Sequence, residues 1–163
     1  MMQTDELLKK GMSSWNLGNP KEAGKIFDQV LALDPNHEEA LVRQGNVLGR
    51  IGKYAEAITY YNRALKLDPK NILALVNKGL SLHYLSNYDD AISCYDQVLT
   101  EKPRNTIAIY NKASSLIKKG DTEQGLHLLA HIIKIDYSFK YKAKFDIDFQ
   151  HLRGSPDFEK IIG

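Results

Sequence analysis

Two histidines, His127 and His131, have the spacing that comes closest to metal chemistry in this sequence. They stand four positions apart in a helical pattern, a geometry that can bring two imidazoles to one zinc ion. A catalytic zinc needs three protein ligands, and neither a cysteine nor a third histidine lies nearby in the sequence. No glutamate follows His127 to complete a metalloprotease motif. We therefore expect both histidines to be solvated surface residues, and we predict no metal site.

The other reactive side chains form no catalytic arrangement. Cys94 falls in the middle of a predicted helix, where a cysteine usually serves as a small packing residue. The paired carboxylates of Asp89 and Asp90, and of Asp146 and Asp148, stand at predicted helix starts and turns, which attract aspartate for capping alone. The sequence contains no phosphate-binding glycine loop, dinucleotide fingerprint or serine-hydrolase elbow. It predicts a protein that is not an enzyme and needs no cofactor.

The composition is that of a globular domain. The chain has 163 residues, 43% of them hydrophobic and 26% charged, which is enough to form one folded core. A formal net charge of +2 is too small to attract the chain strongly to nucleic acid or to an anionic membrane. One cysteine allows no internal disulfide, the apolar runs are short, and the N-terminus is unlike a signal peptide. We expect a cytoplasmic protein without a membrane segment.

A 34-residue repeat is the strongest pattern in the sequence, and it indicates which elements position the side chains. Pro35, Pro69 and Pro103 stand 34 residues apart, and each follows an apolar helix end. Residues 38–71 form the clearest unit, two amphipathic helices that turn at Gly52. Each unit also has two small residues and one larger residue at fixed offsets. They are Gly11, Gly45, Gly79 and Ala113, then Ala23, Ala57, Ala91 and Gly125, then Phe27, Tyr61, Tyr95 and Leu129.

These offsets indicate pairs of closely packed helices. Small residues let two helix axes approach, and the larger residue fills the space beside them. The pattern resembles the tetratricopeptide repeat (TPR) family. The resemblance covers residues 4–139 and implies an all-α, right-handed superhelical solenoid of antiparallel helix pairs. Its four units are 4–37, 38–71, 72–105 and 106–139.

Residues 140–163 do not form a fifth full unit. We expect them to be capping helices packed on the last repeat, because burying a large apolar side chain is worth roughly 1.5–3 kcal/mol. Ser155 and Pro156 predict a helix start. An alternative is that this segment lies in the groove of the solenoid or docks on a second molecule. Its large apolar residues are Phe145, Ile147, Phe149, Leu152, Phe158, Ile161 and Ile162.

The resemblance implies a concave groove lined by the first helix of each unit. Apolar side chains on that wall would leave a strip in water, and such strips usually mark binding sites. We therefore predict a non-catalytic scaffold or adaptor that binds a peptide segment of another protein. The expected groove residues are Met12, Val42, Arg43, Asn46, Arg50, Val76, Asn77, Leu80, Tyr84, Tyr110 and Asn111.

Within this set we assign three kinds of contact. Asn77 and Asn111 occupy the same position in successive units and offer a donor and an acceptor to a peptide backbone. Arg43 and Arg50 would bind an acidic group of the peptide. The apolar anchors would be Val76, Leu80 and Tyr110.

One well-known partner of the family is not expected. TPR proteins that hold the C-terminal carboxylates of heat-shock chaperones use two lysines, two asparagines and an arginine. Asn46 and Asn77 match the asparagines, but the cationic positions fall on Val42, Ile107 and Asn111. Without those cations the carboxylates would lose their charge-assisted hydrogen bonds. We predict that the chain does not bind chaperone C-terminal tails.

Self-association and RNA binding are the other functions that such a fold could serve. The open ends of a solenoid or the aromatic C-terminal segment could pair two copies, so a homo-oligomer that serves as a structural scaffold is the alternative. Binding to RNA would require a clustered basic stripe. The basic groove residues are offset by Asp5 and Glu39, so we predict no nucleic-acid partner.

Overall fold

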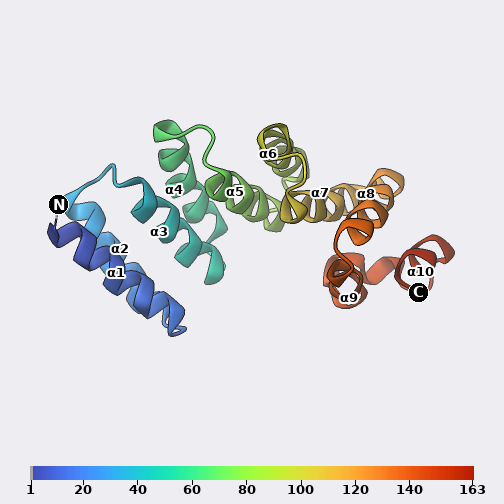
Figure 1. Ribbon diagram of the computed structural model, residues 1–163, viewed down its shortest axis with the longest axis horizontal. Helices are drawn as coiled ribbons and strands as arrows, with labels where there is room; N and C mark the ends of the chain where they lie inside the picture. Colours follow the sequence, from blue (N-terminus) through green and yellow to red (C-terminus); the bar gives the residue numbers. More distant parts are fainter. Residues whose placement is uncertain (1) are drawn as a thin grey trace. The chain divides into compact units, whose positions relative to one another are not determined.

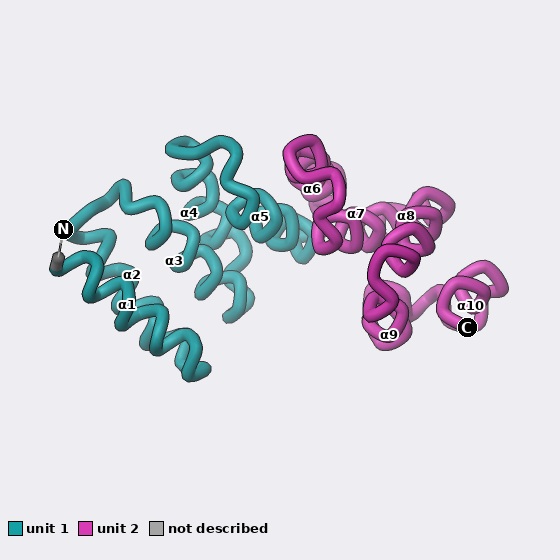
Figure 2. Tube along the Cα trace, in the orientation of Figure 1, with its two compact units in different colours: residues 1–85 teal, residues 86–163 magenta. Residues whose placement is uncertain are grey.

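The computed structural model describes residues 2–163. Their regular secondary structure is entirely helical, as the sequence predicts. The chain divides into two compact units, Met1–Leu85 (unit 1) and Ser86–Gly163 (unit 2), as Figure 2 shows. The division falls at the turn of the third predicted repeat. Of the helices in residues 2–163, none combines the length and the apolar character that a membrane crossing needs.

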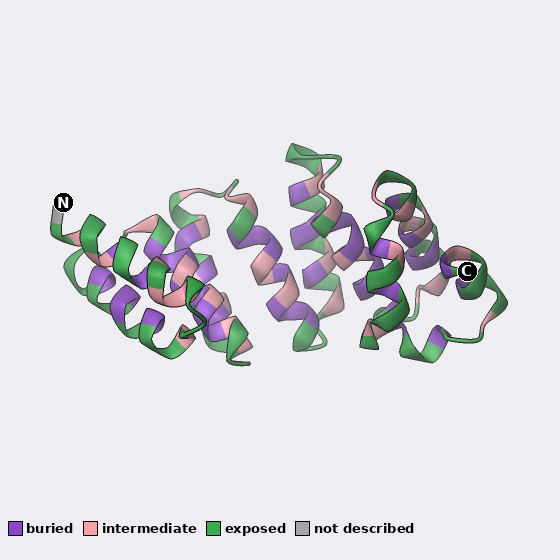
Figure 3. Cartoon of the chain, turned by 60° about the horizontal axis from the view of Figure 1, so that its bottom comes forward, coloured by how far each residue is buried: buried purple, intermediate pink, exposed green. Residues whose placement is uncertain are grey.

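Residues 2–85 of unit 1 form five helices, which Figure 1 shows in chain order. Each helix packs against the next along the chain, so α1 pairs with α2 and α3 pairs with α4, while α5 lies against both α4 and α3. Their apolar faces meet in a single core, and the faces that look outward are exposed (Figure 3). The bounds are α1 Met2–Asn16, α2 Pro20–Leu33, α3 Glu38–Arg50, α4 Tyr54–Leu67 and α5 Ile72–Tyr84.

Unit 2 has six helices, of which the last three are short. The pairs α6 with α7 and α7 with α8 repeat the arrangement of unit 1. The C-terminal residues then pack back on this layer: η1 lies on α7 and α9, and α10 lies on α8 and α9. The bounds are α6 Tyr88–Glu101, α7 Thr106–Lys119, α8 Thr122–Ile135, α9 Ser138–Phe145, the 3-10 helix η1 Ile147–Leu152 and α10 Pro156–Ile162.

The ends of the helices follow the repeat. α2, α4 and α6 each end two residues before Pro35, Pro69 and Pro103, because proline has no N–H to continue a helix. The residue before the next helix is an N-cap whose side chain accepts a hydrogen bond from the backbone N–H three positions on. These caps are His37, Asn71 and Asn105. A cap every 34 residues therefore fixes where each new helix pair starts.

The close approach of helices that the sequence predicts is present in unit 1. A Cβ placed on Gly11 would lie 2.5 Å from Cε1 of Phe27, and one on Gly45 would lie 2.5 Å from Cε1 of Tyr61. Both aromatic rings are buried. Each ring thus occupies the volume that a larger residue at the glycine would need.

The turn inside each repeat has a residue with a left-handed backbone. Gly18, Gly52 and Gly120 have φ values of 79°, 81° and 105°, whereas the third turn has Ser86 at 63°. A left-handed conformation costs roughly 1–2 kcal/mol for a residue with a Cβ, and almost nothing for glycine.

Ser86→Gly is therefore expected to stabilise the protein by about 0.5–1 kcal/mol, because the relief of strain exceeds the extra flexibility of the unfolded chain. The shift in the urea midpoint measures it. Ser93→Gly, at an exposed position inside α6, is the matched control and should lower stability by about 0.5 kcal/mol. A lower midpoint for Ser86→Gly would contradict the argument.

Candidate functional site

A groove in unit 1 brings together five of the predicted residues. Its volume is about 330 Å³, and helices α1, α3, α4 and α5 contribute its walls. We call it the aromatic groove, since three tyrosines and a tryptophan line it. The predicted residues in it are Asn46, Arg50, Asn77, Leu80 and Tyr84, and the others are Trp15, Gly49, Tyr54, Tyr61 and Ser81.

Two asparagine amides stand at the centre of the aromatic groove. Oδ1 of Asn46 accepts hydrogen bonds from the Tyr61 hydroxyl at 2.8 Å and from Nδ2 of Asn77 at 2.8 Å. Ser81 Oγ donates to the backbone carbonyl of Asn77 at 3.0 Å. Burial raises the pKa of the Tyr61 phenol, so this hydroxyl stays protonated and donates at neutral pH.

This network leaves two polar atoms available. Within residues 2–163, neither the amide nitrogen of Asn46 nor the amide oxygen of Asn77 has a hydrogen-bond partner. One is a donor and the other an acceptor. A peptide unit offers the complementary pair, an acceptor C=O and a donor N–H. The two amides can therefore hold one extended backbone segment.

The cation of the aromatic groove is Arg50. Its guanidinium carbon lies 5.5 Å from the centroid of the Trp15 ring, a cation–π contact that orients the side chain. Arg50 is exposed, and no carboxylate of residues 2–163 forms an ion pair with it. It is thus able to accept a carboxylate from outside the chain.

An aromatic wall closes the other side. The rings of Tyr54 and Tyr84 stack with their centroids 4.8 Å apart, and His83 meets the edge of Tyr84 at 5.6 Å. Leu80 is half-buried one helical turn before Tyr84. This wall offers an apolar and aromatic surface to a ligand side chain.

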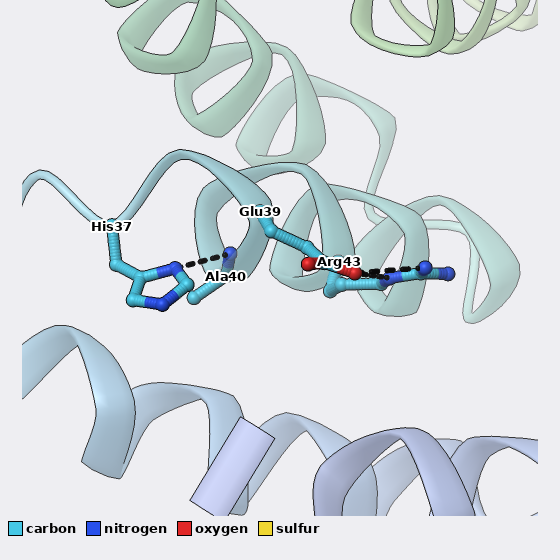
Figure 4. Close-up of polar contacts among 4 residues, drawn as sticks. All are labelled: His37, Glu39, Ala40 and Arg43. Atoms are coloured by element: carbon cyan, nitrogen blue, oxygen red, sulfur yellow. Dashed lines mark hydrogen bonds and ion pairs between the residues drawn. The ribbon is translucent and has the colours of Figure 1, made fainter. Parts of the chain in front are cut away.

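Arg43 and Val42 lie outside the aromatic groove. They line a second hollow of about 550 Å³, near the turn between α2 and α3, together with His37 and Leu73. The Arg43 guanidinium already binds Glu39, at 3.0 Å from Nη2 and 3.3 Å from Nε, as Figure 4 shows. Its charge is therefore largely compensated, and Arg50 is the better candidate for an acidic ligand.

The expected apolar strip is largely absent from the surface. Val42 and Val76 are 3% and 8% exposed, so both belong to the core, and Met12 is half-buried against the core of unit 1. These three residues stabilise the fold and offer little area to a ligand.

In unit 2 the chain itself covers the predicted wall. The Tyr110 hydroxyl donates to Oδ2 of Asp146 at 2.7 Å, and Ser114 Oγ donates to Oδ2 of Asp148 at 2.6 Å. Lys142 Nζ lies 4.2 Å from the centroid of the Tyr110 ring. Tyr110 is only 2% exposed, so it is a core residue and not a peptide anchor.

Asn111, next to it on α7, is half-buried, and it does not line the aromatic groove. Burial, followed by the hydrogen bond to Asp146, raises the pKa of the Tyr110 phenol, so it remains a donor.

The residues with catalytic or metal-binding potential are scattered. His127 and His131 are exposed on α8, and Cys94 is buried on α6. In the part of the chain that the structure describes, no three histidine, cysteine, aspartate or glutamate side chains gather as metal ligands would.

The chain matches family models that describe the same repeat architecture. Family models described as Tetratricopeptide repeat match residues 7–37, 38–71 and 60–93. The chain belongs to the TPR family. The predicted all-α fold of stacked antiparallel helix pairs is thereby confirmed. TPR proteins generally act as protein-interaction scaffolds and are typically non-catalytic. No curated protein sequence matches the chain.

Solved structures share this TPR fold over 70% to 99% of the chain. MamA residues 41 to the end from Desulfovibrio magneticus RS-1 is 20% identical with a TM-score of 0.80, over 98% of this chain and 93% of that one. A TPR protein from Parabacteroides merdae is 21% identical with a TM-score of 0.77, over 99% and 64%. The first TPR of Spaghetti (RPAP3), bound to the HSP90 peptide SRMEEVD, is 22% identical with a TM-score of 0.68, over 70% and 90%.

Proposed function

We propose that the aromatic groove binds an extended peptide segment of another protein that carries an acidic side chain. The observation that carries this proposal is the pair of amide atoms of Asn46 and Asn77 without partners, beside an Arg50 guanidinium without a carboxylate. A short peptide with one acidic side chain presents the matching groups: a backbone C=O, a backbone N–H and one negative charge. The chain would then act as a non-catalytic scaffold or adaptor, the general role of its family.

The acidic group would bind Arg50. The Arg50 guanidinium lies over the Trp15 ring, and a guanidinium presents a planar fork of N–H donors. A carboxylate can accept two parallel hydrogen bonds from such a group, and a hydrogen bond to a charged group is worth about 1.5–3 kcal/mol. Arg43 competes poorly, since a new carboxylate would have to displace Glu39.

The segment that follows the acid would lie along Asn46 and Asn77 toward the aromatic wall. Leu80, Tyr84 and Tyr54 offer apolar area there, so an apolar or aromatic peptide side chain fits best. Affinities on the order of micromolar, about −8 kcal/mol, are expected for such a short contact.

The chaperone tail remains an unfavoured ligand. The RPAP3 domain in the comparison holds an HSP90 peptide, but here the cationic positions are occupied by Val42, Ile107 and Asn111, and Val42 is buried. Two carboxylates placed at those positions would lose water without gaining a cation.

A peptide selection tests the proposal. Phage-displayed random peptides that bind the wild-type chain are expected to be enriched in aspartate or glutamate next to an apolar residue. Arg50→Gln should weaken the selected peptides by at least about tenfold in fluorescence anisotropy, since a charge-assisted hydrogen bond is lost. Asn77→Ala should weaken the selected peptides similarly, because the side-chain amide that contacts the peptide backbone is lost.

The matched control is Arg43→Gln, which removes a charge from the same helix and should change the affinity by less than about twofold. The peptide SRMEEVD is expected to show no micromolar binding. Selected peptides without acidic residues, or equal affinities for wild type and Arg50→Gln, would refute the assignment of Arg50.

A further inference from the structure

Unit 2 has an open groove that the peptide site does not use. It lies between α8 and α10 and has a volume of about 890 Å³. Its floor is apolar and consists of Leu126, Ala130 and Ile133 from α8 with Ile161 from α10. We call it the α8–α10 groove. All its lining residues belong to unit 2, so it is independent of the aromatic groove.

The floor of this groove has the spacing of a helix-packing stripe. Leu126, Ala130 and Ile133 recur after four and three positions, which places them on one face of α8. Ile133 and Ile161 pack with their inner sides on the core of unit 2 and remain half-exposed on the other. Ala130 is the small residue in the stripe, and it lets a partner helix approach closely.

Charges of opposite sign stand at the two ends of the stripe. Glu123 lies in the first turn of α8 and Lys134 in its last turn, and both are exposed. The two residues are eleven positions apart, about three helical turns, so their side chains lie on one face of α8, and both line the groove. Neither residue forms an ion pair within residues 2–163.

This pattern is self-complementary. If two α8 helices lie antiparallel across a twofold axis, Glu123 of each copy meets Lys134 of the other, and Ala130 faces His127. The rim contributed by α10 also carries one residue of each sign, Asp157 and Lys160. A partner of a single charge would meet repulsion at one end, whereas a second copy matches both ends.

We infer that the α8–α10 groove is the contact surface of a homodimer, in which the α8 helices of two copies pack antiparallel. Ala130 stands at the centre of this contact, Leu126 and Ile133 add apolar area at its flank, and the two symmetric Glu123–Lys134 pairs set the orientation. Peptide binding in unit 1 is compatible with this dimer, because the two surfaces share no residue.

Charge reversal tests the register of the contact. In sedimentation velocity runs up to about 100 µM, the wild type should show a dimer that depends on concentration. Glu123→Lys alone and Lys134→Glu alone should each weaken association by at least about tenfold, because like charges then face each other at both ends. An equimolar mixture of the two variants should dimerise again, since every facing pair becomes opposite in charge.

Gln124→Lys is the control on the same helix, because residue 124 is exposed and does not line the groove, and this variant should dimerise like the wild type. Circular dichroism verifies that each variant is folded. A monomeric wild type would overturn the proposal. A mixture that stays monomeric, or a Glu123→Lys variant that dimerises normally, would also overturn it.

Discussion

Phe149→Ala is expected to lower the free energy of unfolding of unit 2 by about 3–5 kcal/mol. The ring of Phe149 is completely buried, and its centroid lies 5.7 Å from that of Tyr110 and 6.0 Å from that of Phe158. It therefore joins η1 to α7 and α10 through one side chain. Alanine would leave a cavity, because the neighbouring Tyr110 ring is itself held by its hydrogen bond to Asp146 and cannot move in to fill the space.

Amide hydrogen exchange in α7 and α8 measures this loss, since protection there reports the opening of unit 2. Phe145→Ala is the matched control: it lies four residues away and is 77% exposed, so its removal should change stability by less than about 0.5 kcal/mol. Equal losses of stability in the two variants would show that the C-terminal segment, residues 140–163, is not anchored through Phe149.

The sequence was sufficient to predict the helix pairs because their signals are local and periodic. Pro35, Pro69 and Pro103 end helices wherever they occur, and a glycine opposite an aromatic residue marks a close helix contact. Of the large apolar residues of the C-terminal segment that were expected to be buried, Phe149, Leu152, Phe158 and Ile162 are, whereas Phe145 and Ile147 are 77% and 75% exposed. What the repeat could not show is where that segment lies, because the pairing of Tyr110 with Asp146 joins residues 36 positions apart outside any repeat.

The candidate site was predictable only in part, because some of its contacts join residues that the repeat pattern does not relate. The repeat frame assigns Asn46, Arg50 and Asn77 to one wall, and the structure groups them in the aromatic groove. Tyr54 lies on a second helix, so the frame does not assign it to that wall, and only the stacked helices bring it against Tyr84. The i, i+4 spacing of Glu39 and Arg43 is a local signal of an ion pair, yet Arg43 was expected to bind an acidic group of the peptide, and the structure pairs it with Glu39 instead.

Gly45 and Gly49 lie one turn apart on α3, and alanine at the two positions is expected to have opposite effects. Gly45→Ala should destabilise unit 1 by about 2–3 kcal/mol, because its Cβ would lie 2.5 Å from Cε1 and 2.8 Å from Cζ of Tyr61. Gly49→Ala should stabilise it by up to about 1 kcal/mol, since alanine favours a helix and its nearest neighbour there, the Tyr61 hydroxyl oxygen, is 3.8 Å away. Urea unfolding of the two variants measures both effects.

The Tyr61 ring links this packing to recognition. It is buried, and its hydroxyl donates to the Asn46 carbonyl oxygen that also accepts from Asn77. A ring displaced by Gly45→Ala would withdraw that donor and release the Asn46 amide, so affinity for selected peptides should fall together with stability. Gly49→Ala leaves the ring in place, so the hydrogen bond from Tyr61 to Asn46 should persist, although its methyl group adds to the wall of the aromatic groove. Normal binding by a destabilised Gly45→Ala variant would mean that Asn46 is positioned without Tyr61, and the backbone contact would then rest on Asn77 alone.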